Sequence, residues 1–308
     1  MTTTTGSEMG LGADAVLNTK RRATPTMILF KRWRRSPVGI VGSVIVLIVV
    51  LTAVLAPFIA PYPPAEHHRK ERFRPPSWMD GGMPNYKLGT DQLGRDILSR
   101  IIYGSRVSVF VGVAAATIGG LLGAILGLFA GYYGGLTDSF ISRLVDTFLS
   151  IPFIVLVLAI VGVLGPSLTT IIVVLGVTGW ASYARVVRGE TLSVRAREFV
   201  MAARVVGCKK GSIMFRHVLP NAFASIIAMA TLDVAATILA ESSLSYLGLG
   251  VQPPTVTWGS MIADGREYLS SAWWLAVFPG LAIMFTVLGV IFLGDWLRDV
   301  LDPRLKEN

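Results

Sequence analysis

Long uncharged apolar stretches restrict the fold of this sequence more than any other feature. No charged residue occurs between Arg35 and Glu66, and Val38 to Ala60 is almost continuously apolar. A helix of about 20 apolar residues spans the membrane core, whereas a cleavable signal peptide has an apolar core of only about 7–15 residues. The stretch therefore predicts an uncleaved first span. Because only helices or closed barrels satisfy the backbone in lipid, we expect an all-α polytopic membrane protein.

The same pattern predicts five further spans. The uncharged interval from Thr147 to Ala184 is too long for one helix, and Gly162, Gly165 and Pro166 divide it. The expected spans are Val107–Tyr132, Val145–Leu164, Leu168–Val187, Asn221–Leu244 and Ala272–Trp296. Composition agrees, because 53% of the 308 residues are hydrophobic and only 15% are charged, against about 25% charged residues in soluble proteins.

The placement of Lys and Arg predicts the orientation. With the N-terminus in the cytoplasm, 19 of the 28 basic residues lie inside and 9 outside, as the positive-inside rule favours. The net charge of +9 is thus explained without nucleic acid. We expect cytoplasmic tails over 1–35 and 298–308, a first span over 36–60, an extracytoplasmic loop over 61–106, and a five-span core over 107–297. A cytoplasmic loop over 188–218 interrupts this core.

Two features inside the spans each allow two interpretations. Four glycines in the second span share one helix face, which indicates close helix packing or a pore lining; they are Gly119, Gly123, Gly127 and Gly131. Asp233 and Glu241 lie eight residues apart, on roughly the same side of the fifth span. A carboxylate at the membrane centre costs roughly 3 kcal/mol and usually faces a cavity or a partner. These two carboxylates either line a translocation pathway or have structural roles, with Asp233 bonded to a neighbouring helix and Glu241 at the outer boundary.

The loop between the fourth and fifth spans is both basic and amphipathic. Arg185 to Arg216 contains eight basic and two acidic residues. An apolar stripe at helical spacing consists of Phe199, Ala202, Ala203 and Val206. Gly207 predicts a helix stop, and a second short helix is expected over Gly211–His217 before Pro220. Such a helix pair either lies on lipid headgroups or docks into a groove of a partner protein.

This loop resembles the cytoplasmic signature of ABC-transporter permeases, which reads Glu-Ala-Ala, three residues, Gly, nine residues and Ile-x-Leu-Pro. Ala202-Ala203, Gly207 and Leu219-Pro220 match that spacing. Met201 and His217 stand in the Glu and Ile positions, and Glu198 lies three residues before the first of them.

Two further stretches are similar to the dipeptide/oligopeptide/nickel branch of that family. They are Leu88–Asp96 and Ser243–Gly250, the latter followed by Pro253-Pro254 and Trp258-Gly259. The resemblance covers about residues 27–305 and is to the second of the two permeases that such importers pair. Both stretches also have structural explanations: Thr90 or Asp91 caps an amphipathic segment, and Tyr246–Gly250 ends the fifth span.

The resemblance implies a non-catalytic permease of an ATP-driven importer in the cell membrane. Its implied partners are a second homologous permease, two ABC ATPase subunits, an extracytoplasmic solute-binding protein and membrane lipid. The implied cargo is a di- or oligopeptide or a related small solute. The implied ATPase contact consists of Glu198, Phe199, Ala202, Ala203, Arg204, Gly207, Leu219 and Pro220, which form a coupling helix and its flanks.

Other chemistry is not expected of this chain. No Gly-Lys-Ser/Thr phosphate-binding motif occurs, and the three histidines and the single Cys208 lack metal-ligand spacing. We therefore expect no catalytic residue, metal or cofactor here, with ATP bound by partner subunits. One alternative is an ion-coupled secondary transporter that uses Asp233 and Glu241 as proton sites. Another is a membrane-anchored scaffold or receptor whose basic loop binds a signalling partner.

Overall fold

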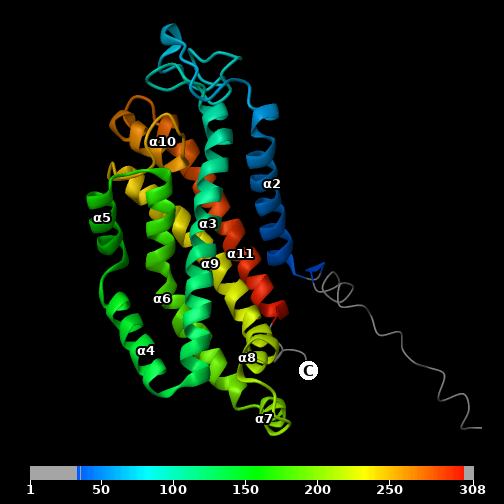
Figure 1. The fold of residues 1–308 in the computed structure, drawn as a ribbon. Helices are drawn as coiled ribbons and strands as arrows, with labels where there is room; N and C mark the ends of the chain where they lie inside the picture. Colours follow the sequence, from blue (N-terminus) through cyan, green and yellow to red (C-terminus); the bar gives the residue numbers. More distant parts are fainter. Residues whose placement is uncertain (1–32, 35, 302–308) are drawn as a thin grey trace, which may run out of the picture.

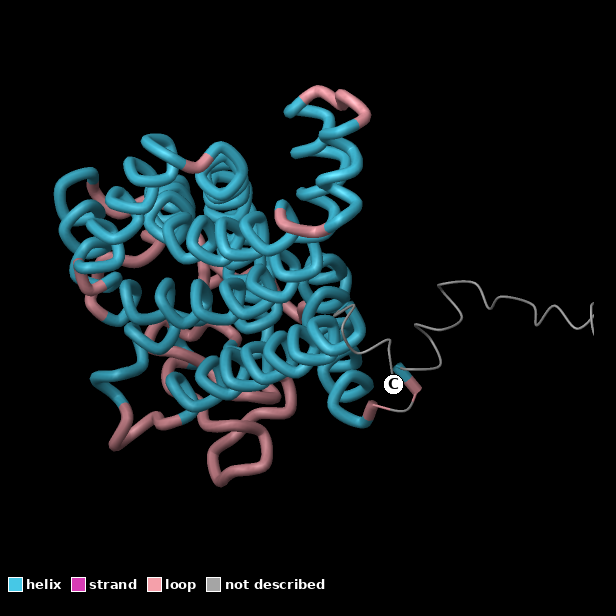
Figure 2. Tube along the Cα trace, turned by 90° about the horizontal axis from the view of Figure 1, so that it is seen from below, coloured by secondary structure: helices cyan, strands magenta, loops and turns pink. Residues whose placement is uncertain are grey.

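Regular secondary structure in the part of the chain that the structure describes is helical. The computed structural model describes residues 33–34 and 36–301, where helices are joined by loops (Figure 2) and a single isolated β-bridge links Thr90 and Asp96. Residues 1–32 and 302–308, which make up most of the two expected cytoplasmic tails, lie outside the described residues. The all-α polytopic fold class is confirmed.

Among the described residues, five helices are long and apolar enough to cross a membrane. They are Pro37–Ile59 (α2), Ile97–Tyr133 (α3), Leu168–Arg195 (α6), the composite helix Lys210–Tyr246, and Trp274–Leu301 (α11). The composite helix joins Lys210–Ile213 (α8), a π-helical turn over Met214–Val218, and Leu219–Tyr246 (α9). The shorter helices are Gly135–Ser150 (α4), Phe153–Leu164 (α5), Glu198–Val205 (α7) and Trp258–Gly265 (α10), and 3₁₀ turns occur at Arg69–Glu71 and Arg266–Tyr268.

The third expected span is bent. The span predicted over Val145–Leu164 begins inside α4 and continues in α5, and the two helices differ in direction by 86°. Pro152 has no N–H group and disfavours a helical conformation at the preceding residue. Ile151 accordingly has an extended backbone with ψ of 129°. Counted as one broken crossing, this pair brings the number of spans to six.

The start of α3 lies well before the expected Val107. Its N-cap is Asp96 rather than Thr90 or Asp91, and the Asp96 carboxylate accepts the Ser99 N–H at 2.8 Å. Burial raises the pKa of the Asp96 carboxyl above its ordinary value. Ile97 packs in a buried cluster with Trp274 and Leu275 of α11. This packing stabilises the first turns of α3. Because charged residues occur in these turns, the hydropathy pattern did not include them in the span.

The glycine face of α3 packs against α6. A Cβ atom at Gly123 would lie 2.5 Å from the Tyr183 Cβ and 2.9 Å from the Ala184 nitrogen. At Gly127 it would lie 2.5 Å from the Ala184 carbonyl oxygen, and at Gly131 2.7 Å from the Thr191 Cβ. Of the two interpretations of this face, close helix packing is therefore confirmed, because there is no space along it for a side chain or a solute.

The bundle has two distinct ends (Figure 1). The start of α2, the end of α11 and the short helix α7 lie at one end, and residues 61–96 and α10 lie at the other. This arrangement follows from an even number of crossings when α4 and α5 are counted together.

Candidate functional site

The expected loop over 188–218 is mostly helical, and only its middle projects from the bundle. Residues up to Arg195 continue α6, and Lys210 already starts the composite helix. Between them, α7 projects from the end of the bundle (Figure 1). Polar and basic residues along both flanks led to the expectation that the neighbouring spans end before this segment, with only two short helices inside it.

One buried side chain anchors α7. Val200 is fully buried and packs in a cluster with Val194 of α6 and Ile213. Ala203 packs against the same cluster and is partly buried. Arg204 reaches back from α7, with its guanidinium carbon 5.8 Å from the centre of the Tyr132 ring. These contacts fix the direction in which the rest of α7 points.

The opposite face of α7 is apolar and exposed. Val205 and Val206 are 87% and 82% exposed, and Phe199 and Met201 are also exposed. The expected stripe of Phe199, Ala202, Ala203 and Val206 is thus divided, since Ala203 packs inward and the others face outward. Periodicity identified an amphipathic helix but missed Val200 as its buried anchor. Large apolar side chains exposed on a short projecting helix are typical of a protein-binding surface.

Gly207 ends α7, as predicted. Its φ is +82°, a left-handed conformation that glycine adopts without steric cost. The Cys208 N–H donates to the Ala203 carbonyl and the Gly207 N–H to the Arg204 carbonyl, each at 3.0 Å. These two bonds form a Schellman motif, which satisfies carbonyl groups at the helix end. The turn therefore sets the angle between α7 and the composite helix.

The expected break before Pro220 is absent. Gly211–His217 was predicted as a separate short helix, but the chain runs from α8 through the π-helical turn into α9. In that turn the Leu219 N–H donates to the Met214 carbonyl, and such wider turns occur where a helix accommodates a local irregularity. Pro220 is the second residue of α9 and directly follows the π-helical turn, where the wider turn accommodates its ring and its missing N–H group. Leu219 packs against the cluster that holds Val200.

Ion pairs that the sequence analysis missed connect α4 to α6 near this site. Arg188 pairs with Asp138 through two hydrogen bonds, and Arg185 lies 2.6 Å from Asp146. Arg195 donates to the carbonyl groups of Gly131 and Tyr132, at 3.2 and 2.8 Å, where α3 ends. These contacts join residues about 40 to 60 positions apart in the sequence. The helices around the base of α7 are therefore tied into one unit.

Asp233 and Glu241 have different partners. Asp233 is partly buried and accepts a hydrogen bond of 3.2 Å from the Tyr183 hydroxyl of α6. Glu241 is fully buried and accepts hydrogen bonds from Ser245 at 2.8 Å and Thr257 at 2.9 Å. Thr257 is also the N-cap of α10, so Glu241 connects α9 to α10. The sequence predicted neighbours on one helix side but not that each carboxylate meets a separate element.

Comparison with known proteins places the chain among importer permeases. Residues 123–307 match the family described as binding-protein-dependent transport system inner membrane component. Residues 24–76 match the N-terminal TM domain of oligopeptide transport permease C.

Individual relatives cover nearly the whole chain. The dipeptide transport system permease protein DppC of Escherichia coli (strain K12) is 43% identical over 284 residues, which is 92% of this chain and 95% of that protein. The di/tripeptide transport system permease protein DppC of Pseudomonas aeruginosa is 42% identical over 265 residues, which is 86% of this chain and 88% of the relative. A solved structure of the inward-facing MetNI methionine ABC transporter contains a similar chain, with a TM-score of 0.54 and 20% identity. That match covers 66% of this chain and 96% of the other, and it supports the fold alone.

Proposed function

This chain belongs to the family of binding-protein-dependent transport system inner membrane components, and on that premise we propose that it is a permease subunit of a dipeptide importer. Its relatives are named as permeases for dipeptides or for di- and tripeptides. We propose a second homologous permease, two ABC ATPase subunits and an extracytoplasmic solute-binding protein as its partners. Catalysis and ATP binding are assigned to the ATPases, and no cofactor to this chain. The comparisons do not support the ion-coupled secondary transporter.

The exposed apolar face of α7 is the observation that supports coupling to an ATPase. An amphipathic helix that lays an apolar face into a groove is a common mode of protein recognition. We propose that Glu198, Phe199, Ala202, Ala203, Arg204 and Gly207 make or shape this contact, and that Leu219 and Pro220 connect it to α9. Movement of the docked ATPases then changes the permease by a rigid-body motion of α7 and the helices tied to it.

This role requires α7 to face the cytoplasm. The excess of basic residues on that side supports the same orientation, with both chain ends in the cytoplasm. Of the two pathway candidates, Asp233 has the stronger support because its side chain is partly exposed. Glu241 is fully buried between α9 and α10, which favours a structural role.

Uptake of a labelled dipeptide tests the proposed function. We expect deletion of the gene to abolish ATP-dependent uptake of radiolabelled glycyl-leucine by intact cells and plasmid-borne wild-type protein to restore it. Uptake of free leucine is the control and should not change. A tagged chain should also co-purify with an ATPase and a second permease. Unchanged dipeptide uptake after deletion would contradict the assignment.

The turn at Gly207 offers a test with a matched pair of variants. We expect Gly207→Val to lower dipeptide uptake about five- to thirtyfold, because a left-handed backbone at a residue with a Cβ costs about 1–2 kcal/mol. Gly207→Asn should retain most uptake, since Asn tolerates this conformation. Apart from its chain neighbours, no described residue places an atom within 4 Å of a Cβ built at Gly207, so a clash with another element does not contribute. Uptake and immunoblots of the membrane fraction are measured together, and equal uptake by both variants would show that the turn geometry is unimportant.

A further inference from the structure

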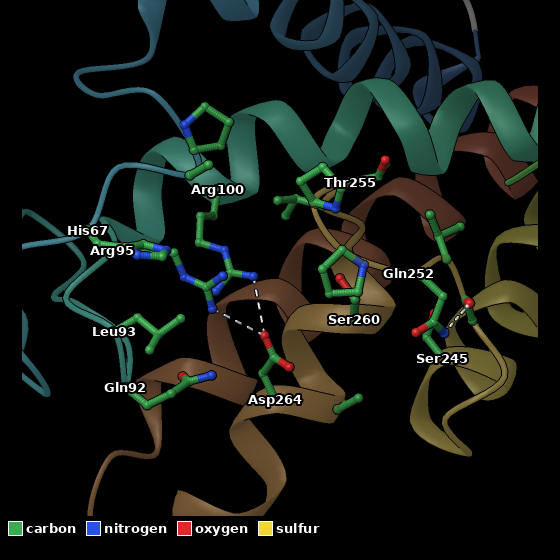
Figure 3. Close-up of a pocket in the computed structure, with 18 of the residues that line it drawn as sticks. His67, Gln92, Leu93, Arg95, Arg100, Ser245, Gln252, Thr255, Ser260 and Asp264 are labelled. Atoms are coloured by element: carbon green, nitrogen blue, oxygen red, sulfur yellow. Dashed lines mark hydrogen bonds and ion pairs between the residues drawn. The ribbon is translucent and has the colours of Figure 1, made fainter. Parts of the chain in front are cut away.

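A cavity of about 630 Å³ opens at the end of the bundle opposite α7. Residues of the segment 61–96, the start of α3 and the segment 245–264 line it (Figure 3). Its volume falls within the roughly 300–1,000 Å³ of pockets that hold small ligands. Neither the coupling contact at α7 nor the packing of α3 on α6 involves this cavity.

Two arginines with one firmly held counterion lie in its wall. The Arg100 side chain is 4% exposed and the Arg95 side chain 14%. Both donate to Asp91, which is 1% exposed and also accepts the N–H groups of Leu93 and Arg95 at 2.8 and 2.9 Å. Asp91 is therefore a fixed partner that compensates one of the two positive charges. The Arg100 Nε has no hydrogen-bond partner among the described residues.

The second counterion is held weakly. Asp264 of α10 places one carboxylate oxygen 3.4 Å from Arg95 and 3.3 Å from Arg100, as the dashed lines in Figure 3 show. Hydrogen bonds between charged groups are usually about 2.7–2.9 Å. The Asp264 side chain is also 40% exposed. An incoming carboxylate can replace Asp264 at a small cost in free energy, because the two arginines keep a negatively charged partner throughout the exchange.

We propose that this cavity binds the free C-terminal carboxylate of a dipeptide, with Arg95 and Arg100 as its partners in place of Asp264. The assignment rests on the proposed function. Gln252, on the other side of the cavity (Figure 3), donates through its amide nitrogen to the Gly250 carbonyl at 3.0 Å, and its side-chain oxygen provides a neutral polar group for the peptide amide. Val251 and Pro253 provide apolar surface for a side chain. Displacement of Asp264 also loosens α10 from the start of α3, so binding changes the contacts that cover this end of the bundle.

Photo-crosslinking tests the site on the assembled complex. The importer is purified with its partner subunits in lipid nanodiscs, without the solute-binding protein, and is exposed to glycyl-p-benzoylphenylalanine or to its C-terminal amide. We expect the free acid to label segment 245–264 or residues near Leu93, and the amide to label at least about tenfold less, since hydrogen bonds to an ionised group are roughly twice as strong as those between neutral groups. Labelled peptides are identified by mass spectrometry.

Two variants should change the labelling in opposite directions. Arg95→Gln should lower labelling by the acid about tenfold, whereas Asp264→Asn should raise it severalfold because a competing carboxylate is removed. Arg74→Gln is the control, since Arg74 pairs with Glu71 at 2.7 Å in the same segment but does not line the cavity. A purely structural role for the arginines would make Arg95→Gln and Asp264→Asn lower labelling alike.

Equal labelling by acid and amide would overturn the site, as would parallel loss in both variants. Absence of labelling, with tighter retention of the solute-binding protein by Asp264→Asn, would assign the arginines to a protein contact and also overturn it. Dipeptide uptake by intact cells is measured in parallel. Uptake that depends on the chain while acid and amide label equally would reject this site and leave the proposed function standing.

Discussion

Dipeptide uptake is expected to fall at least about 100-fold in the double variant Val205→Asp/Val206→Asp. The two side chains are 87% and 82% exposed, so the substitution removes almost no packing within the chain. Burial of a valine in a partner groove contributes roughly 1.5–3 kcal/mol, and each 1.4 kcal/mol changes affinity about tenfold. A buried, unpaired carboxylate adds a further penalty. The loss should therefore appear in docking of the ATPase and not in folding of the permease.

Uptake of labelled dipeptide, the amount of permease in the membrane and co-purification of the ATPase are measured together. The control Val205→Leu/Val206→Leu keeps the face apolar and should retain most uptake. Val200→Asp provides the opposite case, because Val200 is fully buried and its substitution should reduce the amount of folded permease. Full uptake by the double aspartate variant, present at the wild-type level, would show that this face of α7 is not the docking surface.

Some features of the α7 segment were predictable from the sequence and others were not. Gly207 predicted the end of the helix because a left-handed residue at that point is a local requirement of the backbone. Val200 is the buried anchor because Ile213 and Val194 pack against it, and these contacts form only in the folded chain. A periodic apolar stripe identifies an amphipathic helix. Which face of that helix is buried depends on the surface against which the helix packs.

The membrane spans were also only partly predictable from the sequence. Hydropathy predicted six crossings, since the membrane imposes a length on each apolar stretch, and the described residues give six when the bent pair of α4 and α5 is counted as one. The bend between α4 and α5 had a readable signal at Pro152, although the uncharged run across it suggested one straight helix. No local pattern predicts the pairing of Arg188 with Asp138, because these residues meet only after α4 folds back onto α6. The ion pair between Asp91 and Arg100 was likewise not predicted. A role as a helix cap explained Asp91 without requiring a partner on α3.

We expect Gly123→Leu to give the largest loss of folded protein among single substitutions on α3. A Cβ at this position already lies 2.5 Å from the Tyr183 Cβ and 2.9 Å from the Ala184 nitrogen, so α3 and α6 must separate. Tyr183 also donates to Asp233 of α9, and its displacement breaks that link as well. Extra methylene groups in a packed interior typically cost about 1–3 kcal/mol even when the structure adjusts. Here the nearest atoms include the backbone of α6, which cannot move aside as a side chain does.

The measurement is the fraction of permease that elutes as a single species after extraction in mild detergent, with the total in the membrane as reference. Gly123→Leu should insert normally, because insertion depends on apolar length, but should lose most of the monodisperse fraction. Gly189→Leu in α6 is the matched control, since no described atom beyond the adjacent backbone of α6 lies within 4 Å of a Cβ built there. Gly123→Ala should fall between the two, because a single methyl group meets the same α6 atoms. Equal behaviour of the Gly123 and Gly189 variants would mean that helix approach along this face does not hold the bundle together.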